Sequence, residues 1–264
     1  MSLRTDLLMA LDPVTFAKSV DIVPDAWQVR ALRHPGRNLI LNASRQTGKS
    51  TTAAVKALHT ALYKPKSLTL LLSPSLRQSS ELFRKITDLF QYLQQPPEKT
   101  EDNRLSMTLT TGSRIVSLPS KEQNIRGYSD VTLLIVDEAS RVLESLYHSC
   151  RPMLAVSQGS LILMSTPAGK RGFFHTTWTN EDDTWERIEV PATQCERISQ
   201  DFLDEEKRVL GERWFRQEYC CSFEDVEGAI FSHKLIESAF CDEAKPFFGS
   251  VLSDTLEPFI MEGK

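Results

Sequence analysis

The sequence predicts an α/β protein with a mainly parallel central sheet flanked by helices. Two observations carry this prediction. Continuous apolar runs mark strands that are covered on both faces, as in parallel sheets. We predict such strands at residues 38–41, 68–72, 131–136 and 161–164. Stretches with helical spacing of apolar residues separate these runs, and an alternation of strands and helices favours the α/β class.

The first two strands are each followed by a predicted helix. The helices span residues 52–63 and 75–95, and the second carries apolar side chains at helical spacing. Residues 107–110 and 114–118 then flank a Thr-Gly-Ser turn, with glycine at the expected turn position. They predict a β-hairpin that adds antiparallel strands to the sheet.

The composition becomes more polar after residue 171, which suggests a division of the chain. We predict a core with an N-terminal helical segment at 1–171, a small lid subdomain at 172–231, and a linker or tail at 232–264. One further strand is expected at 185–190, ended by Pro191. Ser199 is a candidate N-cap for a helix that Gly211 would stop, with a second helical piece after it.

The bulk numbers are those of an ordinary globular protein. The chain has 264 residues, a net charge of −4, 41% hydrophobic and 25% charged residues. No apolar run approaches the length of a membrane span, and the N-terminus lacks a secretory apolar region. Five cysteines without a C-x-x-C pair argue against a disulfide framework or a zinc site. The acidic net charge does not indicate nucleic-acid binding, although a local basic patch would be enough for it.

Residues 42–51 lie between the first strand and the first predicted helix and read Asn-Ala-Ser-Arg-Gln-Thr-Gly-Lys-Ser-Thr. A strand, a tight loop ending in Gly-Lys-Ser and a helix form the context of a phosphate-binding P-loop. Loop amides and the helix N-terminus point toward an anion there. Lys49 would reach the outer phosphates, and the Ser50 hydroxyl would hold Mg²⁺. The predicted nucleotide contacts are Ser44, Arg45, Gln46, Thr47, Gly48, Lys49, Ser50 and Thr51.

The third strand ends in two carboxylates, Asp137 and Glu138. Open α/β sheets bind ligands at the carboxyl ends of their strands. Asp137 is therefore predicted to position Mg²⁺. Glu138 is predicted to activate the attacking water as general base. Two solvated acids at a strand end would look the same in isolation, but the pairing with Lys49 favours the catalytic interpretation.

Other candidate residues carry weaker signals. Ser165 and Thr166 end the fourth strand and could sense the γ-phosphate, although an ordinary strand-to-turn transition is the better explanation of these two residues in isolation. Gln28 offers a donor and an acceptor that suit the edge of adenine. Arg126, just before the third strand, could stabilise charge that develops on the transferred phosphoryl group, and Arg45 is a second candidate.

Together these motifs resemble the ATPase domain of the large terminase subunit of tailed bacteriophages, the motor that packages DNA into procapsids. The resemblance covers roughly residues 20–231. Ala43, where the standard P-loop has glycine, and the arginine in the loop are typical of this family. The resemblance is carried by residues 44–50, 73–75 with Gln78, 125–127, 136–139, 165–167 with Gly169, and 215–219 with Phe223.

The resemblance implies a P-loop NTPase of the additional-strand, catalytic-glutamate type, with ATP and Mg²⁺ as cofactors. It implies that Ser165 and Thr166 couple hydrolysis to lid movement, that Gln28 contacts adenine, and that Arg126 acts across a ring interface. The implied activity is ATP hydrolysis that drives double-stranded DNA into a viral procapsid in the host cytoplasm. The implied partners are DNA held through its phosphates, the portal, the small terminase subunit and further copies in a ring, whose head-to-tail interface must close. A monomeric, slow isolated domain is compatible with this reading.

Two further expectations concern what the chain lacks and which alternatives compete. About thirty residues follow Phe231, too few for the nuclease domain of full-length terminases, so we expect no DNA cleavage. A helicase-like ATPase lobe is one alternative, but it would need a second sheet domain. A nucleotide-switched assembly module with little turnover is another, and Glu138 argues against it. Candidate DNA contacts are Arg77, Arg84, Lys85, Arg104, Lys121 and Arg126.

Overall fold

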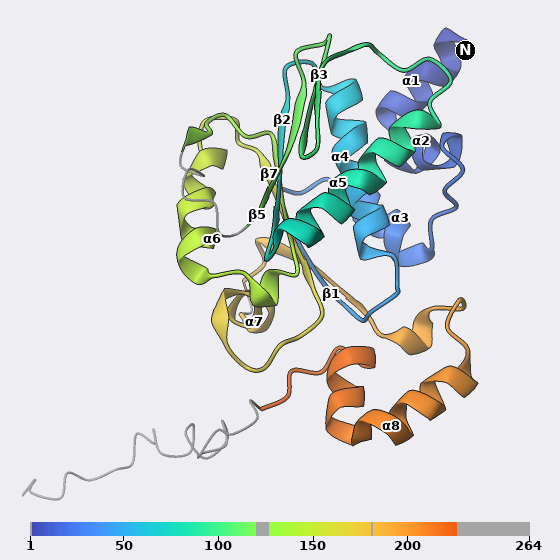
Figure 1. Cartoon of the computed structure of the whole chain (residues 1–264), viewed down its shortest axis with the longest axis vertical. Helices are drawn as coiled ribbons and strands as arrows, with labels where there is room; N and C mark the ends of the chain where they lie inside the picture. The colour runs from blue at the N-terminus through green and yellow to red at the C-terminus, as the bar shows by residue number, and fades with distance from the viewer. Residues whose placement is uncertain (1, 120–126, 181, 226–264) are drawn as a thin grey trace, which may run out of the picture. The chain divides into compact units, whose positions relative to one another are not determined.

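A computed structural model describes residues 2–119, 127–180 and 182–225 (Figure 1). The described residues up to Glu224 form one compact unit, and the fold described is that of this unit. Its eight-stranded sheet has the order β3-β4-β5-β2-β6-β7-β1-β8. The strands from β5 to β8 in this order are parallel to their neighbours, and β3 and β4 are antiparallel additions. The predicted α/β class is confirmed.

The elements have the following bounds. The strands are β1 (Asn38–Ala43), β2 (Leu68–Ser73), β3 (Lys99–Asn103), β4 (Ser106–Leu109), β5 (Arg114–Pro119), β6 (Leu133–Asp137), β7 (Ser160–Ser165) and β8 (Trp185–Val190). The α-helices are α1 (Leu3–Leu11), α2 (Pro13–Ser19), α3 (Ala26–Arg33), α4 (Lys49–Tyr63), α5 (Leu76–Gln91), α6 (Glu144–Cys150), α7 (Gly172–Thr179) and α8 (Gln200–Tyr219).

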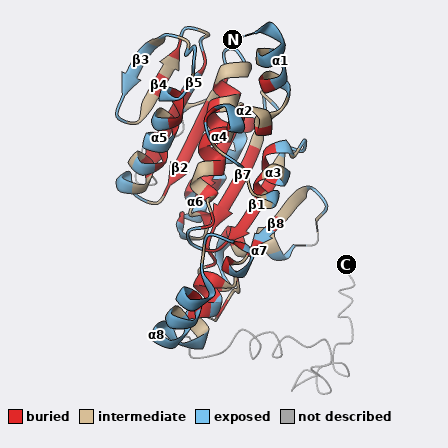
Figure 2. Ribbon diagram, turned by 90° about the vertical axis from the view of Figure 1, so that its right-hand side faces the viewer, coloured by how far each residue is buried: buried red, intermediate tan, exposed pale blue. Residues whose placement is uncertain are grey.

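The sheet separates two apolar cores, because successive side chains of a strand point to opposite faces. In β1, Leu39 and Leu41 join the core beneath α2, α3, α4 and α5, whereas Ile40 joins the core beneath α6 and α7. In β2, Leu71 likewise joins the first of these cores and Leu72 joins the second. Figure 2 shows the buried central strands between these helical layers. Burial on both faces explains why these strands appear as continuous apolar runs.

The four predicted buried strands and the hairpin are confirmed, with small shifts at their ends. The third strand begins at Leu133 rather than at residue 131. The hairpin of β4 and β5 carries an additional strand, β3, which the sequence did not predict. Its residues, Lys-Thr-Glu-Asp-Asn, are polar and mostly exposed at the edge of the sheet, so they carry no apolar signal.

The C-terminal helix α8 has the two predicted features. Ser199 is its N-cap and accepts a hydrogen bond from the Phe202 amide. Gly211 has φ 76° and ψ 164° and interrupts the helix. The helix has a small core of its own, formed by Ala192, Leu203, Phe215 and Tyr219.

The predicted division into core and lid cuts through the packed structure at residue 172. Strand β8 falls within the predicted lid, yet it pairs with β1 along its whole length. The structure therefore places residues 185–190 in the main sheet, because their backbone groups complete the edge of β1. The domain bounds remain a prediction, and the tail at 232–264 lies outside the described residues.

Candidate active site

Residues 44–48 connect the end of β1 to the start of α4 and form the predicted P-loop. Gly48 has φ 101°, a conformation that side chains rarely adopt. A Cβ at this position would also lie 2.9 Å from the Gln28 amide nitrogen. The backbone turn therefore favours glycine here, and any side chain would also have to displace the Gln28 amide.

Lys49 is almost completely buried inside this loop. Its ammonium group donates hydrogen bonds to the Ala43 carbonyl at 2.7 Å, to the Ser44 carbonyl at 2.8 Å and to the Thr166 hydroxyl at 3.4 Å. Burial lowers the pKa of Lys49, and the nearby acids Glu138 and Asp137 act in the opposite direction. A phosphate would replace neutral acceptors by charged ones, which bind an ammonium group more strongly.

A pocket of about 410 Å³ opens on one side of the loop. The opposite walls come from α5 and from the residues that follow β6. Cationic side chains outnumber carboxylates around it, which suits a polyphosphate. Its lining residues are Arg45, Gln46, Thr47, Gly48, Lys49, Ser50, Gln78, Lys85, Glu138 and Arg141.

Asp137 ends β6 and is only 7% exposed. Burial raises its pKa to about 7, and the neighbouring Glu138 charge adds to the shift. One carboxylate oxygen accepts the Glu138 amide at 3.0 Å. The residues present fit a Mg²⁺ site. A nearby cation would favour the ionised form of the buried Asp137 carboxylate, and Ser50 supplies a hydroxyl oxygen. The described part of the chain holds no group of three or more His, Cys, Asp or Glu suited to a metal. Mg²⁺ usually takes few protein ligands and keeps water and substrate phosphates as the others.

Glu138 follows Asp137 with a left-handed backbone, at φ 49° and ψ 46°. Its carboxylate accepts hydrogen bonds from Arg141 at 2.8 Å and from the Ser165 hydroxyl at 3.3 Å. The two adjacent acids therefore face different surroundings, as the sequence predicts for a metal ligand and a base. Arg141 holds the proposed base in place.

The end of β7 is hydrogen-bonded to the turn that follows β6. The hydroxyls of Ser140 and Ser165 lie 2.7 Å apart, and Ser140 donates to the Thr166 carbonyl at 2.8 Å. Thr166 in turn contacts Lys49. The predicted coupling residues thus connect Glu138 with the P-loop, and their role in coupling remains a prediction.

Arg45 connects the P-loop to α8. Its Nε donates to the Glu218 carboxylate at 2.5 Å, and its amide donates to the Glu218 carbonyl at 3.3 Å. The other Glu218 oxygen lies 3.8 Å from an Arg141 nitrogen. A chain of alternating charges therefore runs from Arg45 through Glu218 and Arg141 to Glu138.

Gln28 lies beside the P-loop, but both ends of its amide are bonded to the protein. Its oxygen accepts the Asp25 amide at 2.9 Å, and its nitrogen donates to the Thr52 hydroxyl at 3.0 Å and to the Gly48 carbonyl at 3.4 Å. In this structure the amide tethers α3 to the start of α4. Its contact with adenine stays a prediction. Arg126 lies outside the described residues.

Sequence reasoning missed Arg141 and Glu218 as partners in the site. Arg141 had a local signal, because it follows Glu138 by three residues and such pairs meet on a helical turn. Glu218 had no such local signal and appeared only within residues 215–219 of the family resemblance, since its contact with Arg45 spans 173 residues of sequence. Gln78 and Lys85 appeared only in the family resemblance and among the DNA candidates, and both line the pocket.

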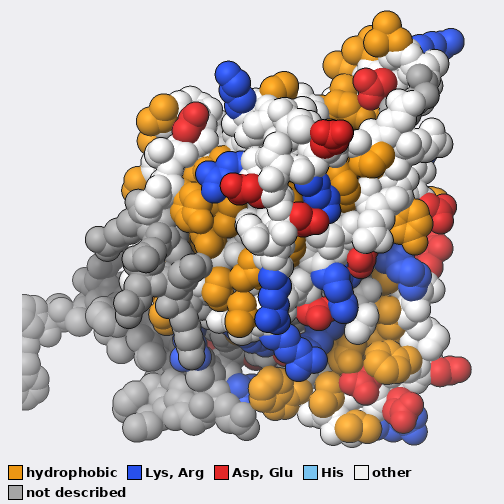
Figure 3. All heavy atoms as spheres, turned by 45° about the horizontal axis from the view of Figure 1, so that its top comes forward, with side chains coloured by type: hydrophobic (Ala, Val, Ile, Leu, Met, Phe, Trp, Pro, Cys, Tyr) orange, Lys and Arg blue, Asp and Glu red, His pale blue; other side chains and the backbone are white. Residues whose placement is uncertain are grey.

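Two of the predicted DNA contacts, Arg84 and Lys85, lie on α5 and face different surroundings. Arg84 pairs with Glu81 on the same helix at 2.6 Å, and Lys85 faces the phosphate pocket. Lys121 lies outside the described residues. On the face shown in Figure 3, Lys and Arg side chains lie among Asp and Glu side chains and apolar ones. DNA binding therefore stays a prediction.

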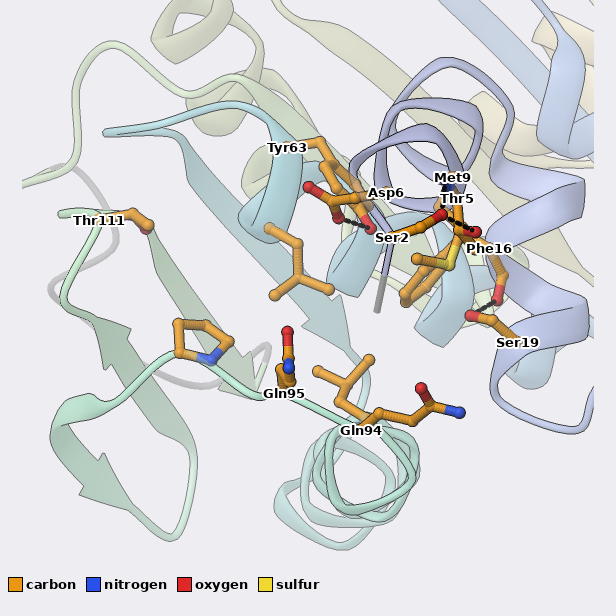
Figure 4. A pocket seen from close by; sticks show the side chains of 13 residues that line it. Ser2, Thr5, Asp6, Met9, Phe16, Ser19, Tyr63, Gln94, Gln95 and Thr111 are labelled. Atoms are coloured by element: carbon orange, nitrogen blue, oxygen red, sulfur yellow. Dashed lines mark hydrogen bonds between the residues drawn. The ribbon is translucent and has the colours of Figure 1, made fainter.

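A second pocket, of about 570 Å³, lies between the N-terminal helices, the end of α4 and the segment that follows α5 (Figure 4). Met9, Phe16 and Leu62 form part of its apolar lining. Tyr63, at the last position of α4, also lines it and donates to Asp6 at 3.4 Å. Helix α4 begins at the P-loop, and 15 residues span about 22 Å. This pocket is thus a feature of the opposite end of α4.

No helix among the described residues combines the length and apolar character needed to cross a bilayer. The P-loop, the Asp-Glu pair on β6 and the Ser-Thr pair on β7 meet at the carboxyl edge of a mainly parallel sheet. This arrangement defines the class of P-loop nucleoside triphosphatases. Within that class, the family model described as "Terminase large subunit, T4likevirus-type, N-terminal" matches residues 40–238, and the chain belongs to this family.

Curated relatives agree with this assignment. The chain is similar to the large terminase subunits of Thermus phage G20c and of Thermus virus P23-45, each 21% identical over 245 residues and covering 79% of this chain. The matched part is 50% of each relative, so the chain spans about half the length of these proteins.

Solved structures agree on the fold. The ATPase domain of the Thermus phage P74-26 large terminase aligns with a TM-score of 0.73 and 18% identity over 81% of this chain and 100% of that one. The bacteriophage HK97 large terminase aligns at 0.64 and 16% over 76% and 50%. The large terminase of bacteriophage D6E in complex with ADP aligns at 0.63 and 11% over 76% and 54%. At such identities the likeness establishes the fold.

Proposed function

We propose that this chain hydrolyses ATP and thereby drives translocation of double-stranded DNA in a phage packaging motor. The observation that carries the proposal is the meeting of Lys49 and Glu138 around one pocket, with the buried Asp137 next to Glu138 at the end of β6. Lys49 provides the cation for the phosphates, and Glu138 provides a base whose carboxylate is separated from the buried Asp137. Family membership and the nucleotide complex of a structural neighbour support ATP as the triphosphate.

Each side chain has a distinct part in the proposed reaction. Loop amides and Lys49 bind the phosphates, and Ser50 with Asp137 would hold Mg²⁺, which supplies charge neutralisation when it is bound. Glu138 accepts the proton of the attacking water. Before that, its hydrogen bonds from Arg141 and Ser165 must leave an oxygen free for the water. Arg45 and Arg126 are the proposed arginines for the charge on the transferred phosphoryl group.

The translocation step needs a link from the pocket to a moving element. We propose that the Arg45–Glu218 pair provides it by tying the P-loop to α8, and that Ser165 and Thr166 report the state of the γ-phosphate to Glu138. In the full motor the chain would act in a ring of copies on a portal, with the small terminase subunit as a further partner. These roles follow from the family and are proposals for this chain.

Phosphate release by the purified chain with ATP and Mg²⁺, measured with and without double-stranded DNA, tests the proposal. Wild type is expected to turn over ATP, and Lys49→Ala is expected to lose turnover by at least about a hundredfold, since removing one electrostatic group from such a site costs about 3 kcal/mol or more. Lys56→Ala is a control, because Lys56 lies on the same helix and donates to the Leu32 carbonyl. Turnover that survives Lys49→Ala would refute the site.

Two alternatives remain tied to specific outcomes. A helicase-like ATPase lobe would separate DNA strands. We expect no strand separation by this chain in a strand-displacement assay. A nucleotide-switched assembly module would bind ATP without meaningful turnover. The ion pair between Glu138 and Arg141 is the observation in its favour, because it engages one carboxylate oxygen of the proposed base. Loss of turnover in Glu138→Gln relative to wild type would exclude this second alternative.

A further inference from the structure

Arg197 is a charged residue beside the P-loop that the proposed reaction does not use. It lies in the segment between β8 and α8. Its two terminal nitrogens donate to the two Asp25 carboxylate oxygens at 2.8 and 2.7 Å. One of them also donates to the Thr47 carbonyl of the P-loop at 3.0 Å. Three segments that are distant in sequence therefore meet at this guanidinium group.

Arg197 lies on the opposite side of the loop from the proposed base. Strand β1, which leads into the loop, has β7 on one side and β8 on the other. Glu138 follows β6, beyond β7, whereas Arg197 follows β8. Among the described residues, the pocket that contains Glu138 is not lined by Arg197.

This placement determines which end of the nucleotide Arg197 would meet. Hydrolysis requires the γ-phosphate to face Glu138, on the β6 side. The remaining phosphates follow the loop amides and the start of α4. The nucleoside must then leave the loop on the β8 side, beside Thr47 and Gly48. A Cβ built on Gly48 would lie 3.7 Å from an Arg197 nitrogen, so the guanidinium group is next to that exit.

The chemistry of the group suits a flat aromatic ring. The bidentate bond to Asp25 fixes the guanidinium plane along one edge and leaves its faces free of that bond. The Arg197 side chain is 54% exposed. Arginine stacks on aromatic faces, both as a cation and as a planar group. Gln28, the residue expected to contact the base, has its amide bonded to the protein and is 6% exposed.

We propose that Arg197 binds the nucleoside end of the triphosphate by stacking its guanidinium plane on a purine ring, with Asp25 holding that plane. The inference rests on the proposed function, because it assumes a nucleotide in the P-loop. It adds a specific binding residue for the base in a segment that precedes α8. A bound purine would thereby contact the segment between β8 and α8 and influence its position.

The test compares two ligands that share their phosphates. Equilibrium binding of ADP and of inorganic pyrophosphate, both with Mg²⁺, is measured by calorimetry for wild type and Arg197→Ala. We expect Arg197→Ala to bind ADP about five- to tenfold more weakly, the size of a cation–π contact, and to bind pyrophosphate within about twofold of wild type. Equal losses for both ligands would show that Arg197 shapes the loop or binds phosphate, and no loss for either would also overturn the proposal.

A matched control exists on α3, the helix that Asp25 precedes as N-cap. Arg30 of α3 bonds to Glu186 of β8 at 2.6 Å and to the Arg187 carbonyl at 3.3 Å, an ion pair and carbonyl contact like those of Arg197 but away from the loop. Arg30→Ala should leave both affinities unchanged. Thermal melting of each variant verifies its fold.

Two conservative variants keep the proposal testable if Arg197→Ala does not fold. Arg197→Lys keeps the charge without the plane, and Asp25→Asn keeps an N-cap for α3 without the ion pair. Both should weaken ADP binding selectively. Full ADP affinity in Arg197→Lys would show that charge alone matters and would contradict stacking. The proposed function fails separately: a wild type that binds neither ligand, or a Lys49→Ala variant that binds both as well as wild type does, would refute the P-loop site itself.

Discussion

At the scale of single residues, the site is organised by Glu218, which lies far from the P-loop in sequence. Its side chain is 10% exposed and accepts a short hydrogen bond from Arg45. A carboxylate that is removed from water needs such a partner to remain charged. Because α8 carries Glu218 and the P-loop carries Arg45, one ion pair links the nucleotide pocket to the C-terminal helix.

The strength of this link can be measured with a double-mutant cycle on Arg45→Ala and Glu218→Ala. Arg45 is 60% exposed, so solvent screens the pair, and we expect a coupling free energy of about 1 kcal/mol in chemical denaturation. The pair Arg84 and Glu81 is the control, since both of its side chains are more than half exposed. A coupling free energy no larger than that of the control pair would contradict the proposed link between the P-loop and α8.

At the scale of elements, Asp12 joins the first three helices. It caps α2 by accepting the amides of Val14 and Thr15, and it accepts two hydrogen bonds from Arg33 of α3 at 2.9 and 2.8 Å. The hydrogen bonds from Arg33 hold the pKa of Asp12 well below its usual range, although partial burial opposes them. The carboxylate therefore stabilises the N-terminal helices only while it is charged.

We expect Asp12→Asn to lower the free energy of unfolding by about 1 kcal/mol at pH 7, because asparagine keeps the N-cap of α2 but loses the ion pair with Arg33. A depressed pKa contributes stability above the ordinary pKa of about 4, and this contribution is lost as the pH falls toward the folded-state pKa. The difference between variant and wild type should shrink between pH 5 and the lowest pH at which both still fold. Denaturation at several pH values measures it, and a difference that grows on acidification would contradict the assignment.

The elements also show what the sequence could and could not predict. The strands β1, β2, β6 and β7 are buried on both faces, so their residues had to be apolar and could be found. Ser199 marked the start of α8 in the sequence, and Gly211 marked the break within it. Strand β3 is polar because it lies at an exposed edge, and the pairing of β8 with β1 depends on contacts between distant segments. The P-loop and the Asp-Glu pair are local motifs, whereas the Glu218 and Arg197 contacts are tertiary and left no local pattern.

At the scale of the whole molecule, the nucleotide should act as a stabilising ligand that bridges several segments. A ligand at one hundred times its dissociation constant adds about 2.7 kcal/mol to the free energy of unfolding. ADP with Mg²⁺ should therefore raise the melting temperature of wild type, and Lys49→Ala should lose most of this shift. An equal shift in both proteins would mean that ADP binds elsewhere.

Removal of the metal should affect the liganded protein alone. The described residues contain no cluster of three or more acidic, His or Cys side chains that could hold a structural ion. EDTA should accordingly reduce the ADP-induced rise in melting temperature while leaving the melting temperature of the unliganded chain unchanged. A lower melting temperature of the unliganded chain in EDTA would indicate a structural metal instead.

The central claim is that Glu138 is the base of a hydrolytic P-loop site. The most direct measurement is single-turnover ATP hydrolysis by wild type and Glu138→Gln, beside ATP binding by both. Glutamine keeps the shape of the side chain but cannot take the proton of the water. We expect hydrolysis to fall by at least about a hundredfold, as for loss of a general base, with ATP affinity within a fewfold of wild type. Equal hydrolysis rates in the two proteins would contradict the account.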